Sequence, residues 1–280
     1  MTRYLVAGAA GMLGHDLQRA LAGRDLRALG RSELDITDRA AVRDAVRDID
    51  VVINAAAYTA VDAAEEHEDE AYAINATGAA NLARAAADAG ARFVQVSTDY
   101  VFHGDATSPY AEDAPLDPLG AYGRTKAAGE RLAREAHPAP HIVRTAWLYG
   151  ANGANFVTTM LRLARERETV MVVDDQRGQP TWSRDLACAI VALLDADAAP
   201  GVYHGTSTGE TSWYGLARAV FAEAGLDPER VRPTDTASFP RPAPRPAYSV
   251  LGHGAWSAAG LAPIRDWRDA LHEALPELRS

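Results

Sequence analysis

A tyrosine and a lysine stand four residues apart, at Tyr122 and Lys126, in a segment with helical composition. Residues at this spacing project from one helix face with their Cβ atoms about 5–6 Å apart. A phenol has a pKa near 10 and is a poor proton donor at neutral pH. A positive charge about 4 Å away contributes about 4 kcal/mol at an effective dielectric of about 20, enough to lower that pKa by roughly 2–3 units. The pair is therefore predicted to be a proton donor tuned by an ammonium.

Lys126 is the only lysine among the 28 basic residues, and all the others are arginines. A guanidinium spreads its charge over a broad fork and is a poorer point charge than an ammonium. The alternative is an incidental pair at helical spacing, which the scarcity of lysine disfavours. Thr98, after a strand predicted over residues 92–97, is a candidate to polarise a substrate carbonyl together with Tyr122. Ser97 offers a competing hydroxyl.

A glycine-rich turn follows the first predicted strand, over residues 3–7, and opens a helix. Gly8 permits the tight turn, Gly11 lets the backbone approach a pyrophosphate, and Gly14 allows close helix–strand packing. The first N–H groups of the helix carry a partial positive charge that favours phosphates. Glycines also serve plain turns, but this position in the chain favours a dinucleotide site.

The segment after the second predicted strand bears on the choice of nicotinamide cofactor. Arg31 suits the 2′-phosphate of NADPH, whereas an acidic residue there would favour NADH. The alternative is an ordinary surface arginine. The sequence thus favours NADPH, with NADH as the second choice. Asp35 and Ile36 are expected beside the adenine, and the small residues at 54–59 let a cofactor lie against the backbone.

Strand and helix patterns alternate through the first half of the chain, which predicts a doubly wound, Rossmann-like parallel sheet. A smaller, mixed C-terminal substrate-binding domain is expected after it. The predicted boundaries are a dinucleotide-binding domain over 1–150 and a substrate domain over 151–280. Strands near 169–173 and 201–205 are expected to return to the first domain's sheet. Helices are predicted over residues 12–21, 40–47, 62–89, 122–135, 156–167, 183–194 and 213–224.

The composition excludes several classes of protein. The chain has 280 residues, of which 48% are hydrophobic, and a formal net charge of -10. It is too apolar for general disorder, and its acidic balance disfavours nucleic-acid binding. Without a long apolar span or a leader, we expect no membrane contact and a cytoplasmic location. Cys188 is predicted to be a core residue. The acidic run at 65–70 indicates a solvated helix face, and no metal site is predicted.

These motifs resemble the extended short-chain dehydrogenase/reductase superfamily and, within it, the dTDP-4-dehydrorhamnose reductase family. Tyr-x-x-x-Lys is shared across the superfamily, whereas Ser-Thr-Asp-Tyr-Val-Phe at residues 97–102 is much narrower. The resemblance spans nearly the whole chain. Its other matching segments are residues 8–14, 34–38, 54–62, 144–149, 175–181 and 245–249.

The resemblance implies reduction of the C4 keto group of dTDP-4-dehydro-L-rhamnose to give dTDP-L-rhamnose. Tyr122 would protonate the C4 oxygen, Lys126 would bind the nicotinamide ribose and tune Tyr122, and Thr98 would complete the triad. Thr98, Asp99 and Trp147 would contact the sugar nucleotide. The cofactor would be lined by Gly11, Met12, Leu13, Asp35, Ile36, Ala57, Tyr58 and Thr59. Some members of the family form magnesium-bridged dimers, and the sequence allows a monomer or a homodimer.

The anionic diphosphate of such a substrate needs local cations in so acidic a chain. Arg241 and Arg245, in a loop stiffened by prolines, are candidate clamps because arginine binds phosphate bidentately. Three alternatives stay open. The protein could be another NDP-deoxysugar 4-ketoreductase of a specialised pathway, a non-catalytic NADP-binding regulatory subunit, or an epimerase that retains an oxidised cofactor.

Overall fold

A six-stranded parallel sheet is the centre of the computed structural model, which describes residues 1–279. The strand order is β10-β5-β4-β3-β1-β2, so the chain runs outward from β1 in both directions. This places a crevice at the carboxyl ends of the strands where the order reverses, between β1 and β3. The strands are β1 (Arg3–Ala7), β2 (Asp25–Leu29), β3 (Val51–Asn54), β4 (Arg92–Thr98), β5 (His141–Thr145) and β10 (Gly201–His204).

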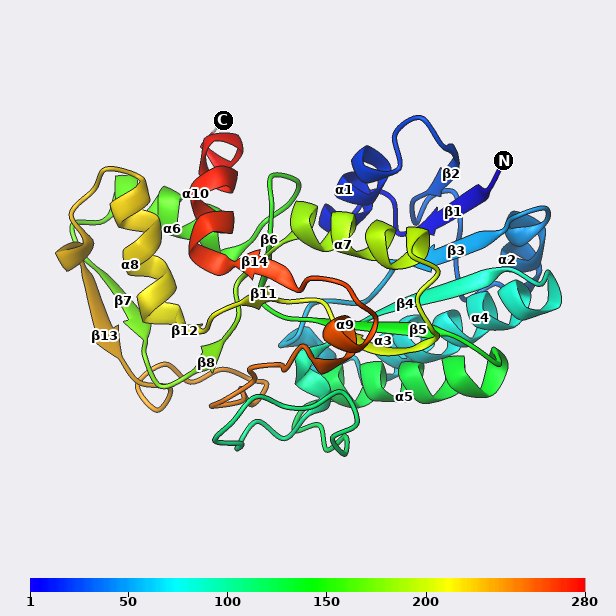
Figure 1. The fold of residues 1–280 in the computed structure, drawn as a ribbon. Coiled ribbons are helices and arrows are strands. Elements are labelled where there is room, and N and C mark those ends of the chain that lie inside the picture. The colour runs from blue at the N-terminus through cyan, green and yellow to red at the C-terminus, as the bar shows by residue number, and fades with distance from the viewer. Residues whose placement is uncertain (280) are drawn as a thin grey trace.

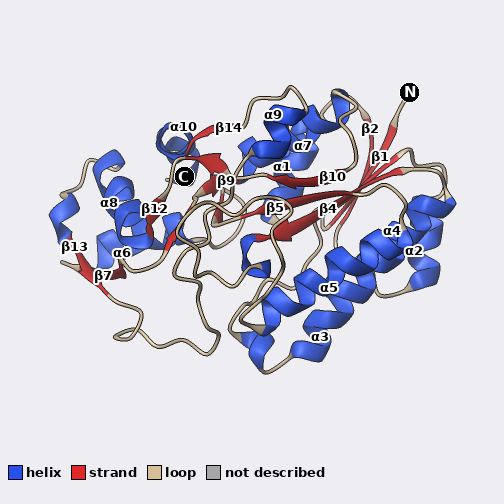
Figure 2. Cartoon of the chain, turned by 60° about the horizontal axis from the view of Figure 1, so that its bottom comes forward, coloured by secondary structure: helices blue, strands red, loops and turns tan. Residues whose placement is uncertain are grey.

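Helices cover both faces of this sheet, which confirms the doubly wound prediction (Figures 1 and 2). One face packs against α1 (Met12–Ala20), α7 (Ser183–Asp195) and α9 (Gly254–Ala258) through a core that includes Leu17 and Ile190. The other face packs against α2 (Arg39–Val46), α4 (Ala79–Asp88) and α5 (Ala121–Ala136) through a core that includes Leu82 and Phe93.

The long helix predicted over residues 62–89 is interrupted. It consists of a 3₁₀ turn η1 (Ala63–Glu65), α3 (Glu68–Tyr72), a π-helical turn η2 (Ala73–Gly78) and α4. Asn75, in the π-helical turn, accepts a hydrogen bond from the Tyr58 N–H at 2.8 Å and donates to the Tyr58 carbonyl at 3.1 Å. The interruption therefore anchors the loop after β3, which borders the crevice.

The acidic run at 65–70 is more than a solvated face, because two of its carboxylates hold the start of α5. Glu65 accepts a hydrogen bond from the Ala121 N–H at 2.8 Å. Glu68 pairs with Arg124 through both guanidinium arms, at 2.9 and 2.6 Å. Anions at a helix N-terminus meet its positive end. These contacts fix the segment that carries Tyr122.

The C-terminal lobe has its own core, formed by α6 (Phe156–Glu166), α8 (Trp213–Glu223) and α10 (Trp267–Leu278). The expectation that a strand near 169–173 returns to the central sheet is wrong. That strand, β7 (Val170–Val173), pairs with β13 (Val231–Thr234), because Val170 and Val172 pack in the C-terminal core. The strand expected near 201–205 is β10, which pairs with β5.

Three further two-stranded ribbons connect this lobe to the central sheet. The first joins β6 (Leu148–Tyr149) to β9 (Thr181–Trp182), directly after β5. The others join β8 (Arg177–Gly178) to β12 (Thr211–Ser212) and β11 (Ser207–Thr208) to β14 (Ile264–Asp266). Because β6 leaves the end of β5 after only two residues, the lobe begins at the edge of the crevice.

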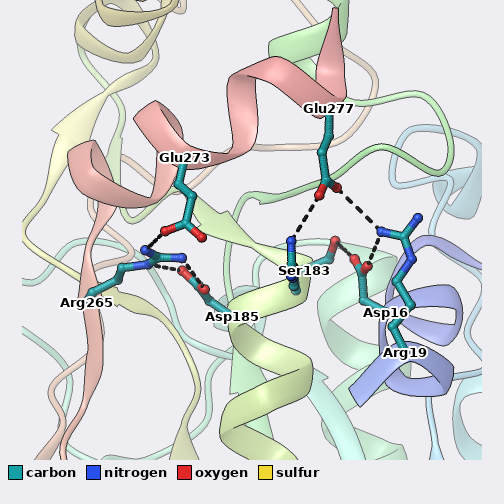
Figure 3. A network of polar contacts seen from close by, with 8 residues as sticks. Asp16, Arg19, Ser183, Asp185, Arg265, Glu273 and Glu277 are labelled. Atoms are coloured by element: carbon teal, nitrogen blue, oxygen red, sulfur yellow. Dashed lines mark hydrogen bonds and ion pairs between the residues drawn. The ribbon is translucent and has the colours of Figure 1, made fainter. Parts of the chain in front are cut away.

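Ion pairs fasten the C-terminal helix to the sheet's helices (Figure 3). Glu277 of α10 lies 3.4 Å from Arg19 of α1 and 3.0 Å from Arg184 of α7. The prediction of a buried Cys188 is wrong, since this thiol is exposed on α7. The apolar run around it is helical, and its neighbours Leu186 and Ile190 take the inward positions. Over residues 1–279, no helix is long and apolar enough to cross a membrane.

Candidate active site

The glycine turn between β1 and α1 has the conformation its residues predict. Gly8 has φ +82°, and a Cβ there would lie 2.5 Å from the Ala56 nitrogen. A Cβ on Gly14 would collide with the Gly8 carbonyl oxygen. Gly11 is the N-cap of α1, and no side chain caps this helix. The N–H groups of its first turn are thus available to an anion, as a pyrophosphate requires.

Two adjoining cavities, of about 560 and 620 Å³, lie along the crevice and share Gly11, Ala55, Ala57 and Thr59 in their walls. Each cavity is large enough to hold about half of a dinucleotide. The first also contains the predicted residues Met12, Leu13, Gly14, Thr98, Tyr122, Lys126 and Trp147. The second also contains Gly8, Arg31, Asp35 and Tyr58. The residues present therefore fit an extended dinucleotide cofactor with a substrate beside it.

Tyr122 and Lys126 enter the first cavity from the same face of α5. Lys126 is buried, and its Nζ donates a hydrogen bond to the Val96 carbonyl of β4 at 2.7 Å. Tyr122 meets the Tyr100 ring edge-on, with centroids 5.8 Å apart. The catalytic helix is thus registered against β4, the strand that supplies Thr98.

The electrostatics of this pair differ from the sequence-based expectation. Burial raises the pKa of Tyr122 to about 12, and the Asp99 charge adds to the rise, while a hydrogen bond with Thr98 acts in the opposite direction. Burial lowers the pKa of Lys126 to about 8. The predicted lowering of the Tyr122 pKa by Lys126 is therefore wrong for this structure, because desolvation dominates. The phenol keeps its proton at neutral pH, which is the state a proton donor needs.

Thr98 and Asp99 follow one another at the end of β4 and are both buried. The Thr98 hydroxyl donates to Asp99 Oδ1 at 3.0 Å and accepts from the Tyr100 N–H at 3.2 Å. Asp99 stands behind Thr98 and is not part of the cavity wall. Burial raises its pKa to about 6. Its Oδ2 has no hydrogen-bond partner among the described residues.

Of the residues predicted beside the adenine and its ribose, Ile36 lies elsewhere, whereas Asp35 and Arg31 are in the wall of the second cavity. Ile36 packs in the sheet's helical core against Gly78 and is not in either cavity wall. Asp35 accepts hydrogen bonds from the Thr37 N–H at 2.9 Å and hydroxyl at 2.7 Å, and the pKa of Asp35 is lowered as a result. Arg31 is 86% exposed, 3.9 Å from Glu70.

Arg245 and Arg241 both bind one carboxylate, that of Asp62, which lies in the loop after β3. Arg245 donates to Asp62 Oδ1 at 2.9 Å, and Arg241 donates to Oδ2. Arg245 also lies over the ring of Tyr100, 6.0 Å from its centroid. Tyr100 is part of the first cavity's wall. The loop that carries Arg241 and Arg245 therefore borders that cavity without entering it.

Several wall residues were not predicted from the sequence. Tyr100 stands in the same run as Thr98, so the narrow motif was a usable signal. The loop at 152–154 carries no distinctive pattern, whereas the β5-end residues Thr145 and Ala146 stand in the matching segment 144–149. In the second cavity the unpredicted residues include Leu34, Thr37, Glu70 and Ile74.

A glycine turn at the switch point of a doubly wound sheet, with the half-buried Tyr122 and the buried Lys126 in the wall of the adjoining cavity, defines a nicotinamide-dependent short-chain dehydrogenase/reductase. The comparisons with known proteins narrow this class. The model of the RmlD substrate binding domain matches residues 2–280. The chain belongs to the dTDP-4-dehydrorhamnose reductase family, whose members are NADPH-dependent oxidoreductases.

Three relatives illustrate the match. A dTDP-4-dehydrorhamnose reductase from Streptomyces griseus is 52% identical, over 99% of this chain and 94% of the relative. A dTDP-4-keto-6-deoxy-D-glucose reductase from Streptomyces niveus is 50% identical, over 99% and 98%. The crystal structure of dTDP-4-dehydrorhamnose reductase from Bacillus anthracis, in complex with NADP, is 40% identical with a TM-score of 0.95, over 99% and 100%.

Proposed function

We propose that the protein reduces the C4 keto group of dTDP-4-dehydro-L-rhamnose with NADPH to give dTDP-L-rhamnose. The observation that carries this proposal is the shared cavity. Tyr122, Lys126 and Thr98 face the same space as the glycine turn, in a chain whose 52%-identical relative is a reductase of that sugar nucleotide. NADPH, when bound, supplies the hydride for the C4 carbon.

Tyr122 gives its hydroxyl proton to the C4 oxygen as the carbon accepts the hydride, so a C–H and an O–H bond form while the C=O π bond breaks. Thr98, a buried hydroxyl beside Tyr122, donates to the same oxygen and stabilises its developing charge. This requires the Thr98 hydroxyl to turn from Asp99 to the substrate. The buried Asp99 then loses a hydrogen bond that it makes in this structure.

Lys126 would bind the nicotinamide ribose from the same helix face, as its position in the cavity wall supports. One N–H of its Nζ donates to the Val96 carbonyl, which orients the ammonium. The other N–H groups are left to donate to ribose hydroxyls. Burial removes water from around it and lowers its pKa to about 8. Below that pH the ammonium is charged and favours the phenolate that Tyr122 becomes after proton transfer.

The cofactor's 2′-phosphate and the substrate's diphosphate have different arginines as their candidate binding residues. Arg31, in the wall of the second cavity, is placed to bind the 2′-phosphate of NADPH, with Met12, Leu13 and the glycine turn at the pyrophosphate. Arg245, beside Tyr100, is the candidate for the substrate's diphosphate. Trp147 is proposed to contact the sugar nucleotide, and Asp99, which lies behind Thr98, to act on it only through the Thr98 hydroxyl. The lobes 1–150 and 151–280 are proposed to divide cofactor and substrate binding.

NADPH consumption by the purified protein with dTDP-4-dehydro-L-rhamnose tests the proposal. We expect turnover coupled to formation of dTDP-L-rhamnose. An absorbance scan before cofactor is added controls for an epimerase, which would carry a tightly bound oxidised nicotinamide. Binding of NADPH without turnover on any keto-sugar nucleotide would instead support a regulatory, non-catalytic role and contradict the proposal.

A second candidate function is favoured by the Streptomyces niveus relative, which is named as a reductase of dTDP-4-keto-6-deoxy-D-glucose at 50% identity. The same residues would perform the same hydride and proton transfer on an epimer. Assaying both keto sugars in parallel separates the two. A kcat/KM at least about 100-fold higher for one of them assigns the substrate.

A further inference from the structure

Trp147 stands at a strained point of the backbone, where the chain leaves the central sheet for the C-terminal lobe. It lies between β5 and β6 and has φ +44°, a region that residues other than glycine rarely adopt. Its indole is part of the first cavity's wall, together with Tyr122. Such strain persists only where the surroundings over-determine it, and it concentrates at functional sites.

Two contacts from the C-terminal lobe enclose this indole. Trp213, the first residue of α8, stacks on it with ring centroids 3.6 Å apart and planes 7° from parallel. Gly178 of β8 lies so close that a Cβ there would be 2.5 Å from Trp147 Cε2. The indole therefore contacts both an aromatic ring and the bare backbone of Gly178.

Trp213 is itself held in place by contacts with neighbouring side chains. Its Nε1 donates to Gln176 Oε1 at 3.1 Å, and the buried Gln176 donates from Nε2 to the Thr236 hydroxyl at 2.9 Å. Phe156 packs against the Trp213 ring with centroids 4.6 Å apart. The stack thus has a fixed support that reaches from β8 to the loop after β13.

We propose that Trp213 is a positioning residue that holds Trp147 in its strained conformation and so sets the wall against which the keto sugar binds. This inference rests on the proposed function. Without the stack, Trp147 can relax to an ordinary backbone conformation, and its indole then leaves the place it takes beside the reacting atoms. Recognition of the sugar suffers, while the glycine turn and the cofactor half of the crevice are unaffected.

The steady-state test uses Trp213→Leu, which keeps an apolar side chain but removes the ring. We expect KM for the keto-sugar nucleotide to rise about 3–10-fold, in line with the worth of an aromatic pair, while the Kd for NADPH is unchanged. Trp213→Phe retains a stacking ring and should restore most of the affinity. A KM unchanged in Trp213→Leu would overturn the inference.

A double-mutant cycle separates positioning from general support of the fold. If Trp213 acts through Trp147, the double variant Trp147→Leu/Trp213→Leu has the same KM as Trp147→Leu alone. Independent, additive increases in KM would contradict the proposal. Trp267→Leu is the matched control, because Trp267 belongs to the same C-terminal core as Trp213 but to another helix. It should lower Tm without raising KM.

Two further measurements keep the outcomes distinct. If Trp213→Leu does not fold, Gln176→Leu removes the acceptor for Trp213 Nε1 together with the hydrogen bond to Thr236, and keeps the Trp213 ring. A KM unchanged in that variant overturns the inference. A crystal structure of either variant is independent of turnover. An indole of Trp147 that stays in place with φ near +44° would refute the positioning role even if the wild-type protein consumed no NADPH, an outcome that would separately refute the proposed function.

Discussion

The two walls of the first cavity differ in how far apart their residues lie along the chain. The wall at β4 and α5 takes Thr98, Tyr122 and Lys126 from fewer than thirty residues of sequence. The distant wall contains Trp147, which stacks on Trp213, and behind the wall residue Tyr100, Arg245 pairs with Asp62, 183 residues away. The proposed proton transfer is therefore a property of a local unit, whereas the proposed substrate recognition depends on how the C-terminal lobe packs onto the sheet.

This difference explains how relatives about 50% identical to the chain are named for two different keto sugars. Under the proposed function, a change in the lobe would alter which sugar is accepted without disturbing the strand and helix that carry the proposed proton donor. Variants in the local wall should therefore change kcat, and variants in the distant wall should change KM for the sugar nucleotide.

The sharpest test of the local wall is Tyr122→Phe. Loss of the group proposed to donate the proton should lower kcat by about 10²–10⁴-fold, because phenylalanine has no hydroxyl to protonate the C4 oxygen. NADPH affinity, measured by fluorescence titration, should be retained. Turnover like that of the wild type would remove Tyr122 from the mechanism.

Arg245→Ala tests the distant wall. We expect a KM for the sugar nucleotide about 10–100-fold higher, with kcat and NADPH affinity little changed, because a charged hydrogen bond to the diphosphate is lost. Arg241→Ala is the comparison, since Arg241 is 48% exposed against 15% for Arg245.

Asp62→Asn tests the same interaction by changing the partner of Arg245 instead of Arg245 itself. It weakens the carboxylate that now pairs with both arginines, so KM should stay the same or fall. If Arg245→Ala leaves KM unchanged, the diphosphate clamp is wrong and the distant wall recognises the sugar by its aromatic residues alone.

Arg31→Ala should have a smaller effect, confined to the cofactor. The side chain is 86% exposed, so solvent weakens its pairing. We expect KM for NADPH to rise about 3–10-fold with KM for NADH unchanged. Equal changes for the two cofactors would exclude a contact between Arg31 and the 2′-phosphate.

The smallest expected effect is on stability, in Asp99→Asn. Burial raises the folded-state pKa of Asp99 from 3.8 to about 6, so the folded protein binds this proton more tightly than the unfolded chain. The wild type therefore loses stability as pH rises from about 4 to 6, when the buried carboxyl must ionise. Asparagine cannot ionise and can still accept the Thr98 hydrogen bond.

The measurement is Tm as a function of pH for both proteins. The two should melt alike near pH 4, and Asp99→Asn should melt about 2–6 °C higher at pH 7.5. A gap of constant size across this range would mean that ionisation of Asp99 does not limit stability.

Parts of the molecule that depend on neighbouring residues could be predicted from the sequence. The glycine turn and the Tyr122–Lys126 spacing each specify a local conformation, and both were found in the predicted elements. The return of the 169–173 strand to the central sheet could not be judged, because any short apolar strand can join either core. The exposure of Cys188 likewise depends on which helix face meets the sheet, and one apolar run does not reveal that.

The electrostatics of the site show the same limit. Spacing along a helix gives the distance between a phenol and an ammonium, but it does not give their solvation. The expectation for Tyr122 used an effective dielectric of about 20, and desolvation became the larger influence on its pKa.

The sequence by itself determined the alternation of strands and helices in the first half of the chain, the glycine turn and the residues proposed to transfer the proton, because each follows from the steric and spacing rules of a few consecutive residues. Only the tertiary structure decided which face of Trp147 is covered, which carboxylate holds Arg245 and how deeply Tyr122 is buried. Those outcomes arise from packing between segments far apart in the chain, and packing depends on the shapes of both partners at once.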